Sequence, residues 1–187
     1  MSRWFFFFLF YSLAGYGLEK LFARAVHAEK QVRKCFLLLP LCPVYGLAMT
    51  ALLALVPAGA GFWTTAALGA VVCTAVEYLV HLFYDKVFGA WFWDYRALPG
   101  HIRGRVCPQF SLAWGVLSAL ALQWVQPAAE MLAVRTPPEV LLVLWVVLAA
   151  DCLLTASLLL RFHDTELLTV RAVRAYTRSV SQSSTSR

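Results

Sequence analysis

Three ionisable residues near the middle of the chain, Glu77, His81 and Asp85, follow one another at intervals of four. Positions i, i+4 and i+8 share one face of a helix, so a helix here would present all three side chains along one stripe. The stretch 62–83 is apolar enough to enter lipid, where an ionisable side chain is costly and needs a partner or a function. A buried carboxyl or an imidazole can titrate near neutral pH, and Glu77 or His81 could then act as a general base.

The same stripe could hold a metal ion, because two ligands four residues apart on one helix are feasible. The sequence shows no second cluster of such residues, and none of its five cysteines forms a CxxC or Cys/His zinc pattern. It also contains no GxxxxGK[ST] loop that would cradle ATP phosphates, and no nucleophile motif. The prediction is therefore no metal site, no cofactor and no catalytic residues, although an enzyme is not excluded.

The composition places these residues in a membrane protein. The chain of 187 residues is 61% hydrophobic and 14% charged, whereas soluble domains are about 45–50% apolar and about 25% charged. We expect an all-α, polytopic helix bundle with five spans, because a span needs about 20 apolar residues. The fourth of these has only 16 uninterrupted residues and is short for a span. The expected spans are Trp4–Phe22, Phe36–Val56, Phe62–Phe83, Phe110–Val125 and Val140–Leu160.

The basic residues predict the orientation. Of the 16 Lys and Arg residues, all but Arg3 and Arg135 fall in the loops on one side of these spans. The positive-inside rule then places the N-terminus outside and the C-terminus in the cytoplasm. Residues 1–160 form the transmembrane domain, and residues 161–187 form a basic, then Ser-rich cytoplasmic tail that is partly disordered. The asymmetry explains the net charge of +6 without nucleic-acid binding.

Two further features of the spans leave alternatives open. Pro40 and Pro43 disturb the start of the second span, which is a kinked helix, a short re-entrant turn, or a helix that begins only after Pro43. Asp151 lies near the middle of the fifth span, either as a hydrogen-bonded carboxyl packed between helices or as part of an ion path. Glu19 ends the first span, either solvated or as an inward-facing partner for a cation.

An aromatic segment follows the Glu77 stripe. Phe88, Trp91, Phe92 and Tyr95 have the i, i+3, i+4, i+7 spacing of an amphipathic helix, which we expect to lie at the cytoplasmic interface. Together with Trp93 they are either an aromatic membrane anchor or a docking surface for a cytoplasmic partner.

The topology gathers most of the unusual polar residues at the cytoplasmic leaflet, which predicts one polar pocket open to the cytoplasm. Its candidate residues are Glu19, Arg33, Cys42, Tyr45, Glu77, Tyr78, His81, Asp85, Asp94 and Arg105.

Several of these residues belong to blocks that resemble the bacterial ABC-transporter permease family called type IV, over about residues 5–120. The chain departs from the family pattern in three places: an extra residue and no Gly between Val32 and Leu37, His101 in place of Asn, and Asp85 in place of Glu. The blocks are Tyr11-Ser12 with Gly15 and Glu19, Arg33 with Phe36-Leu37, Pro40-x-Cys42-Pro43-Val44-Tyr45-Gly46, Glu77-Tyr78, Trp91-x-Trp93-Asp94-Tyr95, Ile102-x-Gly104-Arg105-Val106-Cys107 and Trp114-Gly115.

The resemblance implies a membrane subunit of a transporter in the bacterial inner membrane. Because the chain lacks a phosphate-binding loop, such a subunit needs a separate cytoplasmic ATPase, which we expect to dock on residues 85–107. Five short spans make a small pore, so a homo-oligomer is also expected. Two alternatives stay open. One is a structural or regulatory membrane protein whose charges only pair, and the other is a membrane-embedded enzyme that acts on lipid headgroups.

Overall fold

The computed structural model describes residues 2–25, 35–162 and 165, and within them it is all-α, as expected. One isolated β-bridge, between Ile102 and Val106, is the only extended pairing in the described part of the chain. The candidate residue Arg33 and almost all of the tail 161–187 lie outside the described residues. The helical elements are α1 (Ser2–Ala25), α2 (Pro43–Leu55), α3 (Phe62–Phe83), the π-helical turn η1 (Tyr84–Phe88), α4 (Pro108–Leu120), the π-helical turn η2 (Ala121–Val125), α5 (Gln126–Arg135) and α6 (Pro138–Phe162).

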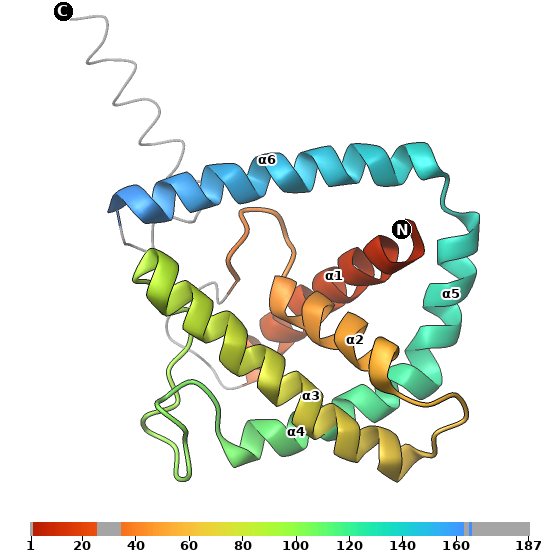
Figure 1. The fold of residues 1–187 in the computed structure, drawn as a ribbon, viewed down its shortest axis with the longest axis horizontal. Coiled ribbons are helices and arrows are strands. Elements are labelled where there is room, and N and C mark those ends of the chain that lie inside the picture. The colour runs from red at the N-terminus through yellow and green to blue at the C-terminus, as the bar shows by residue number, and fades with distance from the viewer. Residues whose placement is uncertain (1, 26–34, 163–164, 166–187) are drawn as a thin grey trace, which may run out of the picture.

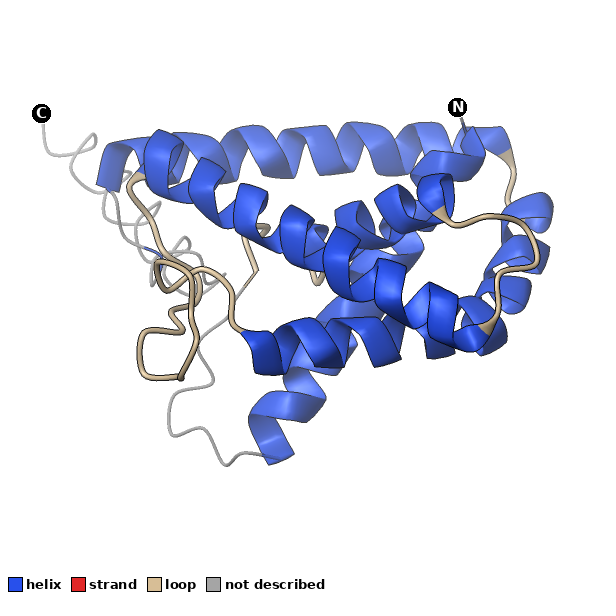
Figure 2. Cartoon of the chain, turned by 60° about the horizontal axis from the view of Figure 1, so that its bottom comes forward, coloured by secondary structure: helices blue, strands red, loops and turns tan. Residues whose placement is uncertain are grey.

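The helices run back and forth between two ends of the molecule (Figure 1). The end of α3 and the end of α6 lie at one of them, while the N-terminus, the end of α2 and the start of α6 lie at the other. The helix α6 extends along one side, and α1 and α2 pack between it and the pair formed by α3 and α4 (Figures 1 and 2). The helices α1, α2, α3 and α4 therefore alternate in direction, and α5 continues from α4 through η2 before α6 returns to the first end (Figure 1).

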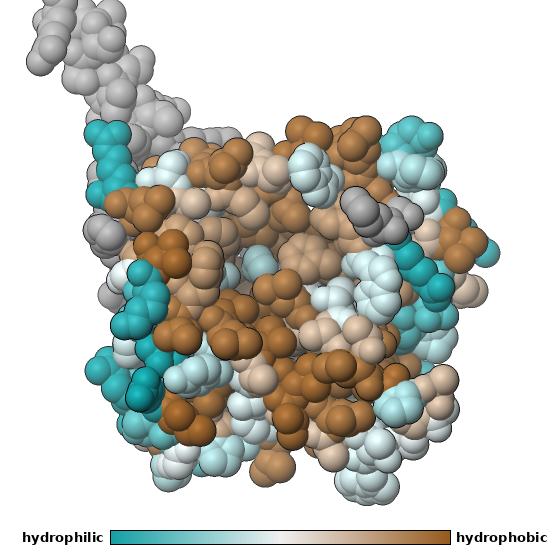
Figure 3. Space-filling model, viewed as in Figure 1, coloured by the Kyte–Doolittle hydropathy of each residue, from teal (hydrophilic) through white to brown (hydrophobic). Residues whose placement is uncertain are grey.

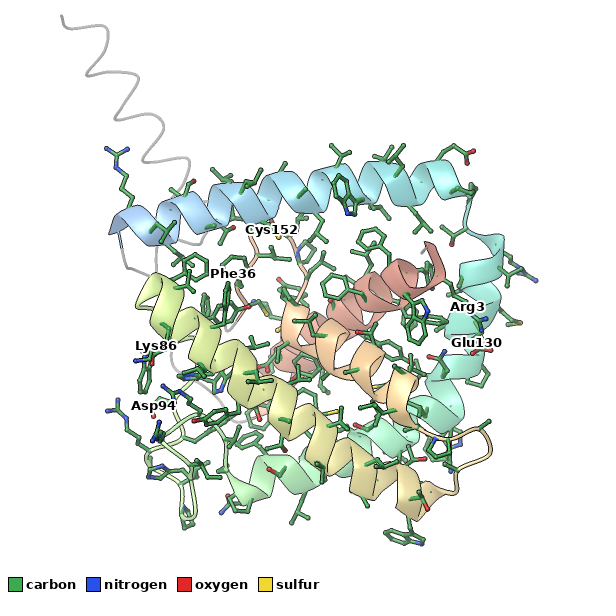
Figure 4. All side chains as sticks on the ribbon, in the orientation of Figure 1. Arg3, Phe36, Lys86, Asp94, Glu130 and Cys152 are labelled. Carbon is green, nitrogen blue, oxygen red and sulfur yellow. The ribbon has the colours of Figure 1, made fainter. Side chains whose placement is uncertain are left out.

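Three helices among the described residues are long and apolar enough to cross a membrane: Arg3–Ala25, Phe62–Phe88 and Pro138–Arg161. Their surface is largely apolar, and hydrophilic side chains gather toward the two ends of the molecule (Figure 3). Lys86 and Asp94 mark one end, and Arg3 and Glu130 mark the opposite end (Figure 4). Three of the five expected spans are thus supported by length and composition, and the crossing of α2 and of α4 stays a prediction.

Small residues bring α1 close to α2. A methyl group on Gly15 would overlap the ring of Tyr45, and one on Gly46 would overlap the hydroxyl of Ser12. Membrane helices use small residues in this way because packing, rather than water exclusion, holds them together. The close approach positions Tyr45 against α1, where the candidate site lies.

Glycine residues also allow α3 and α4 to approach each other closely. A methyl group on Gly115 would lie 2.6 Å from the backbone oxygen of Ala66, and one on Gly69 would lie 2.6 Å from Cβ of Ser118. The Ser118 hydroxyl and the Cys73 thiol are 3.3 Å apart within this interface. Glu77, one turn beyond Cys73, is therefore held against α4.

The second expected span, Phe36–Val56, is helical only from Pro43, so the alternative in which the helix begins after the second proline is confirmed. Residues 35–42 are irregular, and their backbone needs partners from elsewhere. The Asp151 carboxyl of α6 supplies two, since its oxygens accept hydrogen bonds from the amides of Leu38 (3.2 Å) and Leu39 (2.9 Å). Asp151 is therefore a hydrogen-bonded carboxyl, as one of the two alternatives expected, and its partners belong to the irregular segment rather than to another helix.

The expected amphipathic helix over residues 88–95 is wrong. Phe88 ends η1, Gly89 follows with a left-handed φ of 61°, and residues 89–107 form a folded loop. Phe92 packs on Tyr84 of η1, with ring centroids 4.8 Å apart, and Trp93 donates a hydrogen bond to the Arg105 carbonyl at 2.9 Å. Because the loop folds back on η1 and on itself, Phe92 and Trp93 are buried without a helix.

The fourth expected span, Phe110–Val125, does not end in a loop at Gln126, because the helix continues as α5 to Arg135. Pro127 is tolerated because it lies in the first turn of α5, directly after the π-helical turn η2. The Gln126 side chain accepts a hydrogen bond from the Tyr11 hydroxyl at 2.7 Å and so ties α5 to α1.

Candidate functional site

A cavity of about 160 Å³ lies between α1, α2, α3, α4 and the loop 89–107. The two charged residues among those that line it, Glu19 and Glu77, are both acidic. The lining residues are Leu18, Glu19, Phe22, Val44, Tyr45, Glu77, Trp93, Tyr95, Phe110, Ala113, Trp114 and Leu117. The cavity therefore brings together residues that are almost one hundred positions apart in sequence.

Glu19 reaches the cavity from the last turns of α1. Its carboxyl accepts a hydrogen bond from the Tyr45 hydroxyl at 2.9 Å, which joins the end of α1 to the first turn of α2. The side chain is partly exposed, so it borders the cavity rather than being sealed beneath it. The inward-facing alternative for Glu19 is the one that the geometry supports, although the described partner is a hydroxyl and not a cation.

Glu77 is buried, with 4% of its surface exposed. One carboxyl oxygen accepts from the Tyr95 hydroxyl at 2.8 Å, and the other accepts from the Trp114 indole nitrogen at 3.0 Å. Burial, and then the charge of Glu77, raise the pKa of Tyr95 far above its usual value, so this hydroxyl remains a donor at any physiological pH. Glu77 thus links α3, α4 and the loop 89–107 at the cavity wall.

Aromatic rings form much of the rest of the wall. The rings of Tyr95 and Phe110 stack with centroids 4.8 Å apart, and Phe22 meets Phe110 edge-on at 6.1 Å. On another part of the wall, Tyr45 and Trp114 are 4.8 Å apart. Aromatic faces carry partial negative charge, so together with the carboxyl groups they make the interior suited to a cation.

A second cavity, of about 270 Å³, lies next to the first. The two share four lining residues, Leu18, Tyr45, Trp114 and Leu117. Among the described residues that line the second cavity there is no Asp, Glu, Lys, Arg or His. Its other walls come mainly from apolar residues of α1, α4 and η2. An ionisable cavity and an apolar cavity therefore meet across Tyr45 and Trp114.

The remaining predicted polar residues form a separate cluster at the end of α3. Arg105 and Asp85 make an ion pair of 2.7 Å, with side chains 7% and 22% exposed. The Asp85 carboxylate also accepts from the Trp91 indole at 2.7 Å, and the Arg105 guanidinium donates to the Tyr78 hydroxyl at 3.3 Å. Hydrogen bonding to Asp85 raises the pKa of Arg105, which therefore stays a cation. This cluster fastens the loop to α3.

His81 lies between the two groups of residues. It is almost fully buried, its Nε2 is 3.0 Å from the Trp93 carbonyl oxygen, and its ring meets Trp91 and Trp93 edge-on. Nε2 therefore carries the hydrogen of the neutral ring in this contact. His81 does not line the cavity. The three residues of the expected stripe, Glu77, His81 and Asp85, therefore lie in three different environments.

The single pocket expected from sequence is thus divided. Glu19, Tyr45 and Glu77 line the cavity, whereas Tyr78, His81, Asp85 and Arg105 lie in or beside the ion-pair cluster. Cys42 is buried at the start of α2 and does not line the cavity. Asp94 is exposed and is held by Arg96, whose hydrogen bonds keep the pKa of the Asp94 carboxyl below its usual range. In the described part of the chain, no three metal-ligating side chains lie together.

The residues expected to form a docking surface do not share one exposed surface. Phe88, Phe92 and Trp93 are buried, Tyr95 is partly buried, and Trp91 is 37% exposed. Trp93 and Tyr95 line the cavity instead.

Sequence reasoning missed the contribution of α4 to the cavity. Phe110, Trp114 and Leu117 line it from one face of that helix, and their spacing of four and three residues is the signal that marks this face. Phe22 also lines the cavity and was missed, because it lies at the end of an apolar run and nothing in the sequence sets it apart from its neighbours.

The family model described as “Putative ABC-transporter type IV” matches residues 6–156 of the chain. The match therefore contains both cavities and the ion-pair cluster, and it extends past the expected residues 5–120 into α5 and α6. No curated protein and no solved structure matches the chain.

Proposed function

The chain belongs to the family described as “Putative ABC-transporter type IV”, and from this premise we propose that it is the membrane subunit of a transporter whose solute binds in the cavity at Glu19 and Glu77. The observation that carries the proposal is the cavity itself. It combines two carboxyl groups with aromatic walls inside a protein whose described residues include three membrane-capable helices. Ligand sites are typically largely apolar cavities with a few convergent polar groups, and ionisable residues inside membrane segments mark solute paths by default.

Such a subunit needs an ATPase partner, because its sequence has no GxxxxGK[ST] loop. The loop 89–107 is the proposed docking region. Trp91 and Ile102 expose 37% and 58% of their surface there, and large exposed apolar side chains beside charged ones are typical of a partner surface.

The proposed orientation places this loop in the cytoplasm, with the N-terminus outside and with five spans, as the distribution of basic residues predicts. The loop 89–107 and the turn between α2 and α3 lie at opposite ends of the bundle (Figure 1), and each contains an exposed alanine in a turn, Ala97 and Ala58 respectively. A membrane-impermeant thiol reagent applied to intact cells should label Ala58→Cys but not Ala97→Cys, and inverted vesicles should give the reverse. Labelling of Ala97→Cys in intact cells would rule out a cytoplasmic loop.

The transporter proposal is tested by purifying the tagged protein in mild detergent from its native membranes and measuring ATP hydrolysis that copurifies with it. We expect vanadate-sensitive hydrolysis, and a copurifying subunit whose sequence carries the phosphate-binding loop. Ile102→Asp should abolish the association, because it places a charge at the centre of the proposed surface. Ala58→Asp, at the far end of the molecule, is the matched control and should retain it. Absence of ATP hydrolysis from the purified wild-type protein would contradict the proposal.

One observation favours a structural role for part of the polar residues. The Asp85–Arg105 pair forms within the loop cluster at 2.7 Å, so each of the two charges has a partner without a ligand. The alternative in which all the charges only pair is separated from transport by Glu77→Gln. In a transporter, this variant inserts in normal amount and loses transport-coupled ATP hydrolysis. In a structural protein, it only lowers the amount of inserted protein.

A further inference from the structure

The two adjoining cavities differ in chemistry. The first contains the carboxyl groups of Glu19 and Glu77, and the second has walls without a charged residue. Tyr45 and Trp114 border both. A single ligand that fills both cavities must therefore have a polar end and an apolar end.

The polar end is defined by the walls of the first cavity. Its charged lining residues are acidic, and no Lys or Arg is among the lining residues that the structure describes. An anionic phosphate beside the carboxyl group of Glu19 would be repelled by it, which is unfavourable at low dielectric. An ammonium group gains from the carboxyl and also from the faces of Phe110, Tyr95 and Trp114, since cations bind aromatic faces within about 6 Å of the ring centre.

The apolar end is defined by the second cavity, which runs from Leu18 and Leu117 toward Met49 and Ala121. Its volume of about 270 Å³ exceeds that of the first cavity. Transfer of an aliphatic chain from water into such a space contributes about 0.8 kcal/mol for each buried methylene, or about fourfold in affinity.

We propose that the joined cavities bind an amphiphilic organic cation, with its ammonium head beside Glu19 and its aliphatic chain in the apolar cavity. The proposal names the class of solute and so rests on the proposed function only for the step of transport. Binding itself does not depend on an ATPase. A membrane subunit with this site would select its solute by the head charge and by the chain length together.

The test uses the full chain in nanodiscs of zwitterionic lipid, with dodecyltrimethylammonium as the probe below its micelle concentration. Empty nanodiscs of the same lipid give the background partition into the bilayer. Calorimetry should show saturable binding to the wild-type protein beyond this background. The neutral and anionic probes with the same chain, dodecyl maltoside and dodecyl sulfate, should bind at least about tenfold more weakly, a difference of about 1.4 kcal/mol.

Two variants test the two ends of the site. Glu19→Gln keeps an oxygen for the Tyr45 hydroxyl, so it should fold, yet it should weaken binding of the cation about tenfold. Glu130→Gln changes an exposed carboxyl of α5 that pairs with Arg3 and accepts a hydrogen bond from Gln126; Glu130 lines neither cavity, so the variant should bind as the wild type does. Ala121→Phe fills part of the apolar cavity, so the gain in affinity from butyl- to dodecyltrimethylammonium should shrink.

The proposal is overturned if the cationic and neutral probes bind equally. It is also overturned if Glu19→Gln binds the cation as tightly as Glu130→Gln does. A protein without an associated ATPase that still binds the cation selectively would overturn the proposed transport and leave this site standing. A protein with an associated ATPase but no preference for the cation would overturn this site and leave the proposed transport standing.

Discussion

Replacing Asp151 by asparagine is expected to release the irregular segment 35–42 from α6. The two oxygens of the Asp151 carboxyl accept hydrogen bonds from the backbone amides of Leu38 and Leu39, at 3.2 and 2.9 Å. An asparagine can accept only one of these bonds, and its amino group would face the other amide as a second donor. The segment should then open locally more often, while the packing of α3 on α4 is unchanged.

The size of the effect follows from the bonds that are lost. Side-chain hydrogen bonds within membrane proteins contribute about 0.6 kcal/mol on average and up to about 1.7 kcal/mol, and an unfavourable donor contact adds to the loss. We therefore expect local opening to become easier by about 1.4 kcal/mol, which raises the open fraction about tenfold.

The cysteines supply the assay, because they report on different parts of the fold. Cys35 and Cys42 lie at the two ends of the segment, with 2% and 1% of their surface exposed, and Cys73 is fully buried between α3 and α4. When closing is faster than labelling, the rate of thiol modification follows the open fraction. In Asp151→Asn, mass spectrometry should show Cys35 and Cys42 labelled about tenfold faster and Cys73 changed by less than about twofold.

Glu139→Gln serves as the control, since it changes an exposed carboxyl at the start of the same helix and should leave all of these rates unchanged. Equal acceleration of every buried thiol in Asp151→Asn would mean that the contact supports the whole fold. Wild-type labelling rates at Cys35 and Cys42 would mean that the Asp151 hydrogen bonds do not hold the segment 35–42 closed, which would refute the prediction.

Three other changes test the packing and the loop. Gly115→Val should lower stability by about 2 kcal/mol in thermal unfolding in detergent, because even its first carbon would lie 2.6 Å from the Ala66 oxygen; an unchanged melting temperature would exclude this close approach. Arg105→Ala should lower stability because it leaves Asp85, whose side chain is 22% exposed, without its cation, and adding Asp85→Asn should restore part of the loss; strict additivity in the double variant would argue against the pair. Gly89→Ala should cost about 1 kcal/mol in chemical denaturation, since its φ is 61°, and a neutral result would show that the loop adopts another turn.

The class of protein and part of the site were predictable because they depend on local properties. Hydropathy indicated membrane helices, and the two prolines indicated a disturbed start of the second span, with a helix that begins only after Pro43 as one of three alternatives. The cost of a carboxyl in an apolar helix drew attention to Glu77, which the structure places in the cavity wall. Each of these inferences requires only the residue and its near neighbours in the sequence.

The aromatic segment shows where local spacing fails. The interval from Phe88 to Tyr95 matches a helix, but spacing reports which side chains could share a face and not whether the backbone is helical. Here Gly89 turns the chain, and the indole nitrogen of Trp93 bonds to the backbone of Arg105, a contact that sequence spacing does not reveal. The burial of Phe92 and Trp93 consequently depends on contacts between residues distant in sequence.

The division of the expected pocket has the same cause. Glu77 and Asp85 lie on one helix stripe, yet Glu77 meets Trp114 from α4, whereas Asp85 meets Arg105 from the loop. Which partner each carboxyl receives depends on how α4 packs, and that packing rests on close contacts at residues such as Gly115. Periodicity within one helix cannot predict it.

The central claim, that the cavities between α1 and α4 are a binding site, is tested most directly by locating a bound ligand. A dodecylammonium probe with a photoreactive diazirine near the end of its chain would be irradiated in membranes that contain the protein, and adducts mapped by mass spectrometry. The account predicts adducts on the cavity residues Leu117 and Ala121, reduced by Glu19→Gln and by excess dodecyltrimethylammonium. Adducts confined to outward-facing residues of α6 such as Leu153, with the same yield in Glu19→Gln, would contradict it.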